Sequence, residues 1–193
     1  MLLDEVIRAV IASALFAAIP LVWWLITART EESFFAYIGI KRMTVKKKTV
    51  FFVPLFLTVI LVALMPLVLD PLLPTDIQSA NARFAGRGAR AVLPIIVFAF
   101  FATALPEEIL FRGFLGKYLS KRFGFVAGNT AQAVIFGLLH GADMFAALGS
   151  WVPMLVIALT AAFGWLTGFV DEKSDGSIIP GIVLPDCRTY TPL

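Results

Sequence analysis

The sequence is poor in three residue types that carry much of protein chemistry: cysteine, histidine and the charged residues. Its 193 residues include one cysteine, Cys187, and one histidine, His140. A single cysteine cannot form an intrachain disulfide, and one cysteine with one histidine cannot supply a cysteine–histidine zinc site. Charged residues make up 15% of the chain, against about 25% in soluble globular domains. The composition excludes a disulfide scaffold and a zinc finger.

Apolar sequence takes the place of charge. Hydrophobic residues make up 60% of the chain, and its mean hydropathy is +0.90. The net charge is only +3, and no basic patch with interleaved aromatic residues occurs, so we expect no nucleic-acid partner. Asp4 and Glu5 lie beside Arg8, where a secretory signal peptide would have a purely basic start. We therefore predict an integral membrane protein whose first apolar run is a retained helix.

The apolar runs predict an all-α, polytopic bundle with about five membrane spans and a partial sixth. About 20 apolar residues are enough to cross a bilayer. The expected spans are 6–27, 49–69, 91–118, 124–139 and 152–170, with a loop at 141–151, a charged turn at 171–176 and a short apolar start at 177–184. We expect one membrane domain, 1–193, with two accessory spans in 1–90 and a motif-bearing core in 91–185.

Basic residues predict how the loops alternate across the membrane. If loop 29–48 is cytoplasmic, alternation places 117–122 and 171–175 on the same side. These three segments hold ten Lys and Arg residues, against four in the outside segments. This excess satisfies the positive-inside rule and predicts an outside N-terminus.

One charged stretch, Pro106 to Gly113, interrupts an apolar run at membrane depth. Each charge there costs about 2.5–3.5 kcal/mol even on lenient scales. Glu108 and Arg112 are four residues apart and share a helix face, so they can form an ion pair. Glu107 points about 100° away, which makes it the candidate general base. The alternative is that all three charges form one ion cluster that only fixes helix packing.

A polar stripe follows on the predicted span 124–139. Its members are spaced by three or four residues and comprise Asn129, Gln132, Phe136, His140 and Asp143. They fall within an arc of roughly 80° on a helical wheel, and such a stripe faces protein or water instead of lipid. Asp143, one turn beyond His140, can orient or charge its ring. A lone histidine often only packs, but beside two acids it favours a site, with Asn129, Gln132, Phe136 and Asp143 as candidate binding residues.

Two glycine pairs indicate where helices approach closely. Gly137 with Gly141, and Gly164 with Gly168, follow the small-xxx-small pattern. Ordinary membrane-helix glycine is an equally weighted alternative.

The motif Glu107-Glu108-x-x-x-Arg112, followed by Phe136-x-x-x-His140, resembles the first two motifs of the CPBP intramembrane proteases. That family includes the type II CAAX prenyl endopeptidases and bacterial Abi-type proteins. The resemblance implies hydrolysis of a peptide bond within the membrane by a water that Glu107 and His140 activate. It also implies that Glu108 and Arg112 hold their helix in place and that Phe136 packs near His140.

The resemblance covers roughly residues 90–185 and implies the surroundings of the reaction. It implies a membrane-associated peptide or protein substrate, the lipid bilayer as partner, and a multi-pass protein of a bacterial or archaeal plasma membrane. The family is described as metallopeptidase-like, so a divalent metal such as zinc would have Glu107 and His140 as ligands, whereas a metal-free activated water is also proposed. Two glutamates and one histidine are a poor zinc set, so no cofactor is assigned.

The chain departs from the family at its third motif, His-x-x-x-Asn, which is credited with stabilising the oxyanion. Residues 176–184 look like the lead-in to this motif, but 185–193 change in character and contain no histidine. We expect a truncated or frame-shifted end and an impaired enzyme, since losing one oxyanion donor typically costs 10²–10³ in rate.

The departure keeps two other function classes open. The first is a non-catalytic membrane scaffold or a bacteriocin-immunity-like protein of the same fold. The second is a proton-coupled transporter that uses Glu107 and His140 as a relay. Transporters usually contain inverted repeats, and this sequence shows none.

Overall fold

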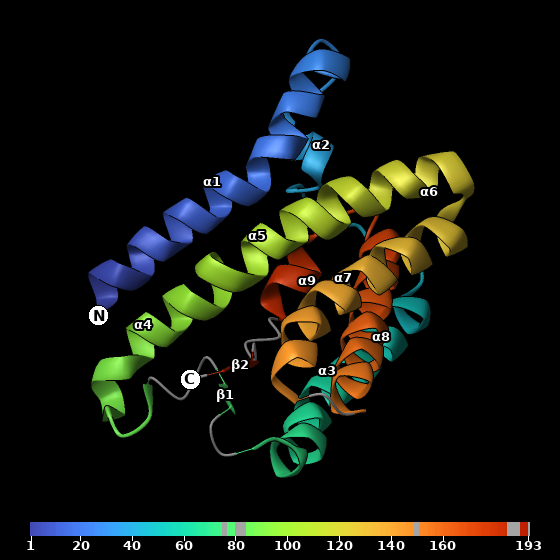
Figure 1. Ribbon diagram of the computed structural model, residues 1–193. Coiled ribbons are helices and arrows are strands. Elements are labelled where there is room, and N and C mark those ends of the chain that lie inside the picture. Colours follow the sequence, from blue (N-terminus) through green and yellow to red (C-terminus); the bar gives the residue numbers. More distant parts are fainter. Residues whose placement is uncertain (75–76, 80–83, 149–150, 185–189, 193) are drawn as a thin grey trace.

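A computed structural model describes residues 1–74, 77–79, 84–148, 151–184 and 190–192. The described part is a bundle of helices (Figure 1), which confirms the predicted all-α class. Four of its helices are long and apolar enough to cross a membrane: Leu2–Thr27, Lys48–Leu72, Gly88–Phe123 and Val152–Lys173. The chain is therefore an integral, multi-pass membrane protein, while the number of crossings stays a prediction.

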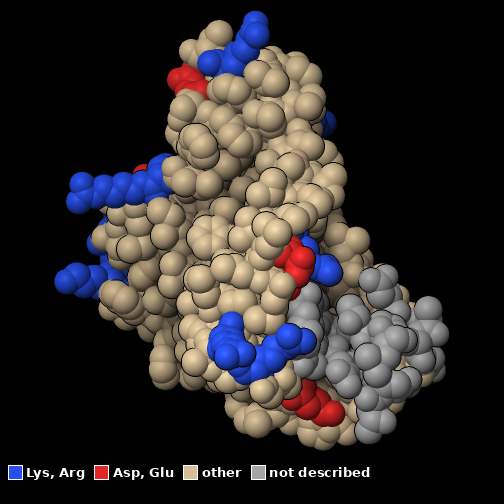
Figure 2. Space-filling view, turned by 90° about the vertical axis from the view of Figure 1, so that its left-hand side faces the viewer, with Lys and Arg blue, Asp and Glu red and all other residues tan. Residues whose placement is uncertain are grey.

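Helices α1 (Leu2–Thr27) and α3 (Lys48–Leu69) carry much of the surface suited to lipid. In the most apolar 18-residue stretch of α1, only 11% is buried inside the molecule. Large apolar side chains such as Leu3 and Ile26 are exposed on it, as is Phe56 on α3. In Figure 2, the side of the molecule on which α1 begins is mostly tan, with Lys, Arg, Asp and Glu side chains on only a small part of it. A continuous apolar surface of this kind fits contact with acyl chains.

The span that carries the acid pair is one long helix built from six consecutive segments. They are η3 (Gly88–Ala91), α4 (Val92–Ile96), η4 (Val97–Ala104), α5 (Leu105–Glu107), η5 (Glu108–Gly116) and α6 (Lys117–Phe123). The segments η4 and η5 are π-helical, and they flank the turn that contains Pro106. Proline has no N–H to donate to the helix ladder, and π segments frequently occur at functional sites. Their presence was not predicted.

Helices α7 (Phe125–Leu148) and α8 (Val152–Lys173) lie side by side (Figure 1) and approach closely. A Cβ atom on Gly137 would lie 2.5 Å from the carbonyl oxygen of Ile157, and one on Gly168 would collide with the side chain of Asn129. The close approach predicted from the glycine pairs is confirmed.

The predicted end of span 124–139 is wrong, because α7 continues through the expected loop to Leu148. Gly141 suggested a loop, yet it is buried against Pro153 and Ile157 of α8. A small residue at a helix–helix contact favours continued helix in a membrane protein. His140 therefore lies within α7 and not at its end.

Short elements complete the described chain. They are α2 (Phe34–Ile38), η1 (Asp70–Leu72), α9 (Ile179–Val183) and two three-residue strands, β1 (Ile77–Ser79) and β2 (Tyr190–Pro192), which pair antiparallel. The strands are a small departure from the all-helical expectation. Cys187 and the expected break at 185 lie outside the described residues.

The three basic segments predicted to share one side of the membrane contact one another. Lys117 Nζ donates to the carbonyl oxygen of Tyr37 at 3.3 Å. Lys41 forms an ion pair with Asp175 at 3.6 Å, and its carbonyl accepts from Ser177 Oγ at 2.9 Å. The loop before α3, the start of α6 and the end of α8 therefore lie at the same end of the bundle.

Candidate active site

The predicted ion pair is confirmed. Arg112 Nε lies 3.4 Å from Glu108 Oε1, and both side chains are almost fully buried. They share one face of the long helix, four residues apart, as an i, i+4 pair does. A pair buried in this way is costly to desolvate, and removing one partner strands the other charge.

Arg112 joins three helices at one point. Its Nε and Nη2 atoms donate to Thr167 Oγ1 of α8 at 3.2 and 3.0 Å. Its guanidinium carbon lies 4.2 Å from the centre of the Phe136 ring on α7, a cation–π distance. The guanidinium thus fixes η5 against α7 and α8 through charge, hydrogen bonds and ring contact together.

Glu107 points about 100° away from Glu108 on this helix and faces His140 of α7. Its Oε1 atom is 3.8 Å from His140 Nε2. The two side chains are 18% and 19% exposed, whereas those of Glu108 and Arg112 are 4% and 2% exposed. The structure therefore brings together the two residues that the sequence placed in one site, and it keeps them reachable.

The orientation of His140 follows from its other ring nitrogen. Nδ1 lies 2.9 Å from the carbonyl oxygen of Phe136, and a carbonyl can only accept. Nδ1 therefore carries a proton, which in a neutral ring leaves Nε2 as an acceptor directed at Glu107. The Phe136 ring packs against the imidazole with 4.2 Å between ring centres, in agreement with the contact implied by the resemblance.

The amides of the stripe connect α7 to α8. Asn129 Nδ2 donates to Trp165 O at 2.9 Å, and Gln132 Nε2 donates to Gly164 O at 3.0 Å and to Asn129 Oδ1 at 2.9 Å. Both side chains are buried, so the stripe faces protein, as predicted. The candidate binding role of these amides stays a prediction. The side chain of Asp143 lies outside the described residues, and its suggested action on His140 stays a prediction as well.

Comparison with known families gives one match. Residues 89–184 match the family described as Rce1-like, type II CAAX prenyl endopeptidase. The chain belongs to the Rce1-like family. The match contains all of the residues that form the Glu107–His140 and Glu108–Arg112 pairs. No curated protein and no solved structure matches the chain. Membership in this family supports a membrane protease function, and the finer chemistry rests on the geometry.

The resemblance seen in the sequence implied a possible divalent metal such as zinc, and the described donors can be compared with the needs of that ion. A catalytic zinc takes three protein ligands and leaves one open position. Among the described residues, no three His, Cys, Asp or Glu side chains gather in a group that could hold a metal ion. Glu107 and His140 supply two donors, and Glu108 is already paired with Arg112. The described donors do not fit a catalytic zinc.

Asp171 and Thr167 are buried polar residues of α8 that the sequence analysis missed. Asp171 looked like the first residue of a charged turn, but it is the last buried position of α8 and interacts with Glu108. A signal was present: small and polar residues follow one face of α8 at Thr160, Gly164, Thr167, Gly168 and Asp171. Spacings of four, three, one and three residues mark a single helix face.

A cavity of about 60 Å³ adjoins this buried cluster. Arg112, Gln132 and Asp171 line it, and each has a buried polar atom without a hydrogen-bond partner among the described residues: Nη1 of the arginine, Oε1 of the glutamine, and both carboxylate oxygens of the aspartate. Polar cavities of this size hold ordered water. The Glu108–Arg112 side of the long helix is therefore a closed polar core, and the Phe136 ring lies between it and the accessible Glu107–His140 pair.

Proposed function

We propose that this protein is an intramembrane endopeptidase in which Glu107 and His140 activate a water to hydrolyse a peptide bond. The observation that carries the proposal is the 3.8 Å approach of Glu107 Oε1 to His140 Nε2, with both side chains partly exposed. A water within about 2.6–3.2 Å of both atoms fits this separation. Membership in the Rce1-like family supports the same reaction class.

Glu107 acts as the base and then as the acid. It takes one proton from the water while the water oxygen bonds to the carbonyl carbon of the scissile peptide and the π electrons of that carbonyl move to its oxygen. His140 Nε2 accepts a hydrogen bond from the second O–H of the water and orients it, because Nδ1 donates to Phe136 O; this hydrogen stays on the attacking oxygen. When the tetrahedral intermediate collapses, the C–N bond breaks and Glu107 returns its proton to the leaving nitrogen. Such proton transfer typically contributes 10²–10⁴-fold.

Glu108 and Arg112 support this reaction by holding the helix that presents Glu107. The pair is buried and bonded across to α8, so it fixes the rotation of the helix about its axis. Positioning of this kind keeps the carboxylate of Glu107 aimed at His140. No step passes through a metal, because the described donors number two.

The substrate class follows from the membrane setting. Glu107 lies near the middle of the helix Gly88–Phe123, so the scissile bond must reach the interior of the bundle. A membrane-associated peptide or protein can do so. The family description names CAAX prenyl endopeptidases, and a prenylated C-terminal peptide is the first substrate to examine.

The test uses the full chain in proteoliposomes with a quenched fluorescent peptide, prepared with and without a farnesyl group. Product masses identify the cleaved bond. Glu107→Gln and His140→Gln should each lower turnover by about 10²-fold or more. Glu31→Gln, an exposed loop acid, is the matched control and should leave turnover intact. Unchanged turnover in either site variant would contradict the mechanism. Equal cleavage of the peptides with and without farnesyl would show that the substrate need not be prenylated, and it would leave the mechanism unaffected.

A second candidate is a non-catalytic membrane scaffold or immunity-like protein of the same fold. One observation favours it: His140 is the sole histidine of the sequence, so no His-x-x-x-Asn donor for an oxyanion occurs in it. Appending a helix with that motif after residue 184 distinguishes the candidates. Hydrolysis gained by the extended chain supports an impaired enzyme, and its absence with every peptide tested supports the scaffold.

A further inference from the structure

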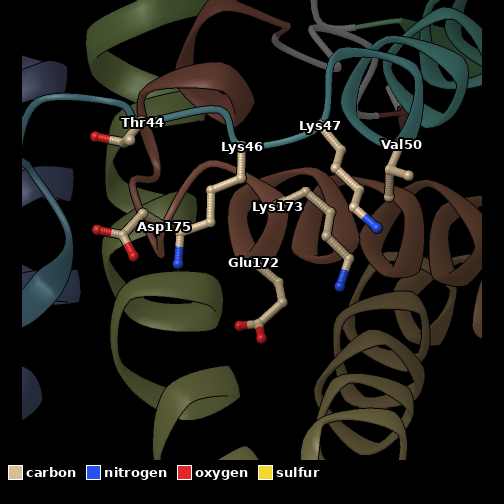
Figure 3. Close-up of a pocket in the computed structure, with 7 residues that line it drawn as sticks. All are labelled: Thr44, Lys46, Lys47, Val50, Glu172, Lys173 and Asp175. Atoms are coloured by element: carbon tan, nitrogen blue, oxygen red, sulfur yellow. The ribbon is translucent and has the colours of Figure 1, made fainter.

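A basic pocket lies at the end of the bundle where α3 begins and α8 ends (Figure 3). Its volume is about 390 Å³, and Thr44, Val50 and Glu172 line it together with three lysines. In Figure 3 the side chains of Lys47, just before α3, and Lys173, on α8, end on the same side of the pocket, and Lys46 extends from the preceding loop to the side where Asp175 lies. The pocket is separate from the Glu107–His140 pair and shares none of its residues.

The charge of this pocket is positive. Asp175, which also lines it, forms an ion pair with Lys41 at 3.6 Å. Glu172 is then the one remaining carboxylate among the lining residues, against three ammonium groups. Lys46 and Lys47 are exposed. The first turn of α3 adds to the positive potential of the pocket, because helix N-termini carry partial positive charge. The side chain of the N-cap residue, Lys47, does not cap the N–H groups of this turn.

Lys173 is held in place before any ligand arrives. Its Nζ atom lies 4.9 Å from the centre of the Phe169 ring and 5.9 Å from that of Phe125. These are cation–π distances, and the side chain is half-buried. A fixed ammonium group loses less conformational freedom on binding than a free one.

The pocket lies at an end of two candidate spans, and an apolar groove lies on the neighbouring first turns of α3. Two candidate spans, Lys48–Leu72 and Val152–Lys173, end at it. The groove, of about 420 Å³, runs along the first turns of α3 and is lined by Lys48, Phe52, Phe56 and their neighbours. Phosphates of a bilayer lie at the ends of the spans, with acyl chains directly below. The cationic pocket can take the phosphate of one phospholipid, and the apolar groove can take one of its acyl chains.

The geometry points to a binding site for an anionic phospholipid, with its phosphate group beside Lys47 and Lys173, further positive charge from Lys46, and one acyl chain along α3. A free phosphate shares the headgroup chemistry, but it would leave the groove on α3 unused. This site acts independently of hydrolysis by Glu107 and His140.

Native mass spectrometry of the full chain, delipidated in detergent, tests the assignment. Phosphatidylglycerol and phosphatidylcholine of equal chain length are added in turn. We expect the unaltered chain to retain one phosphatidylglycerol in preference to phosphatidylcholine. Lys46→Gln with Lys47→Gln should lower the phosphatidylglycerol affinity by about 25-fold, at roughly fivefold per lysine near the surface.

The matched control is Lys121→Gln with Arg122→Gln, which removes the same charge at the same end of the bundle but outside the pocket. It should keep the bound phosphatidylglycerol. Equal losses in both double variants would overturn the site in favour of general attraction. Thermal unfolding of each variant without lipid shows whether the fold is kept, and Lys173→Gln gives an independent reading from α8 if the first variant fails to fold.

Inorganic phosphate alone separates the two sources of the headgroup chemistry. If phosphate displaces little phosphatidylglycerol, the acyl chain contributes to binding, as proposed. If phosphate competes fully at low concentration, or if phosphatidylcholine binds as well as phosphatidylglycerol, the assignment to an anionic lipid is wrong.

Discussion

Two adjacent carboxylates of the long helix end in opposite environments. Glu107 lies beside His140 with 18% of its side chain exposed. Glu108 is buried against Arg112, and Gly181 of α9 closes over its carboxylate. One residue of helix turns the side chain by about 100°, which is enough to separate an accessible pair from a closed core. Neighbours of the same type can therefore carry different roles when each has its own partner.

The largest effect on stability is expected when the closed core loses its cation. Arg112→Met leaves Glu108 buried without its partner, which costs about 3–5 kcal/mol. The free energy of unfolding in detergent, measured by chemical denaturation, checks this. Arg29→Met, at an exposed loop position, is the control and should change stability little. A loss below about 1 kcal/mol in Arg112→Met would mean that the core is not closed.

A smaller loss is expected when the core loses its link to α8. Thr167→Val keeps the shape of the side chain and removes the oxygen that accepts from Arg112 Nε and Nη2. A buried charged donor left without its acceptor costs about 1.5–3 kcal/mol. Thr130→Val, which removes an exposed hydroxyl bonded to Trp165, should cost less than half as much in the same measurement. Equal losses of stability would mean that the hydrogen bonds from Arg112 to Thr167 stabilise the fold no more than the exposed bond from Trp165 to Thr130.

The packing of α7 on α8 affects both environments at once. Gly137→Leu forces side-chain atoms into the backbone of Ile157, and overpacking of this kind costs about 1–3 kcal/mol. Because His140 lies on α7, the shift should also separate it from Glu107 and lower peptide turnover. Ala127→Leu, at an exposed position of the same helix, serves as the control. Full turnover in Gly137→Leu would show that the accessible pair tolerates movement of α7.

The smallest effect is expected from metal removal. The described residues offer two donors at the accessible pair, fewer than the three of a catalytic zinc. Peptide turnover should therefore persist in the presence of 1,10-phenanthroline or EDTA. Loss of turnover with a chelator, restored by added zinc, would contradict this expectation. It would mean that a residue outside the described ones completes a zinc site with Glu107 and His140.

The sequence predicted much of this arrangement, for physical reasons that can be named. Apolar length fixes where helices can span, and the i, i+4 spacing of Glu108 and Arg112 fixes their pairing. The stripe on α7 was predicted to face protein or water instead of lipid, and the buried side chains of Asn129 and Gln132 agree.

Other features depend on contacts that no periodicity reveals. The π segments η4 and η5 are a change of hydrogen-bond register, and Pro106 was the one local hint of it. The extension of α7 past His140 depends on α8 burying Gly141. Asp171 could be placed in the core only once α8 was seen to continue through it.

The most direct test of the account compares Glu107→Gln with Glu108→Gln, two isosteric changes one residue apart. Peptide turnover and the unfolding free energy are measured for both variants in the same membrane mimetic. We expect Glu107→Gln to lower turnover by about 10²-fold or more and to keep stability, whereas Glu108→Gln should lower stability because Arg112 loses its counter-charge. Turnover that is kept in Glu107→Gln, or is abolished in a fully stable Glu108→Gln, would contradict the account.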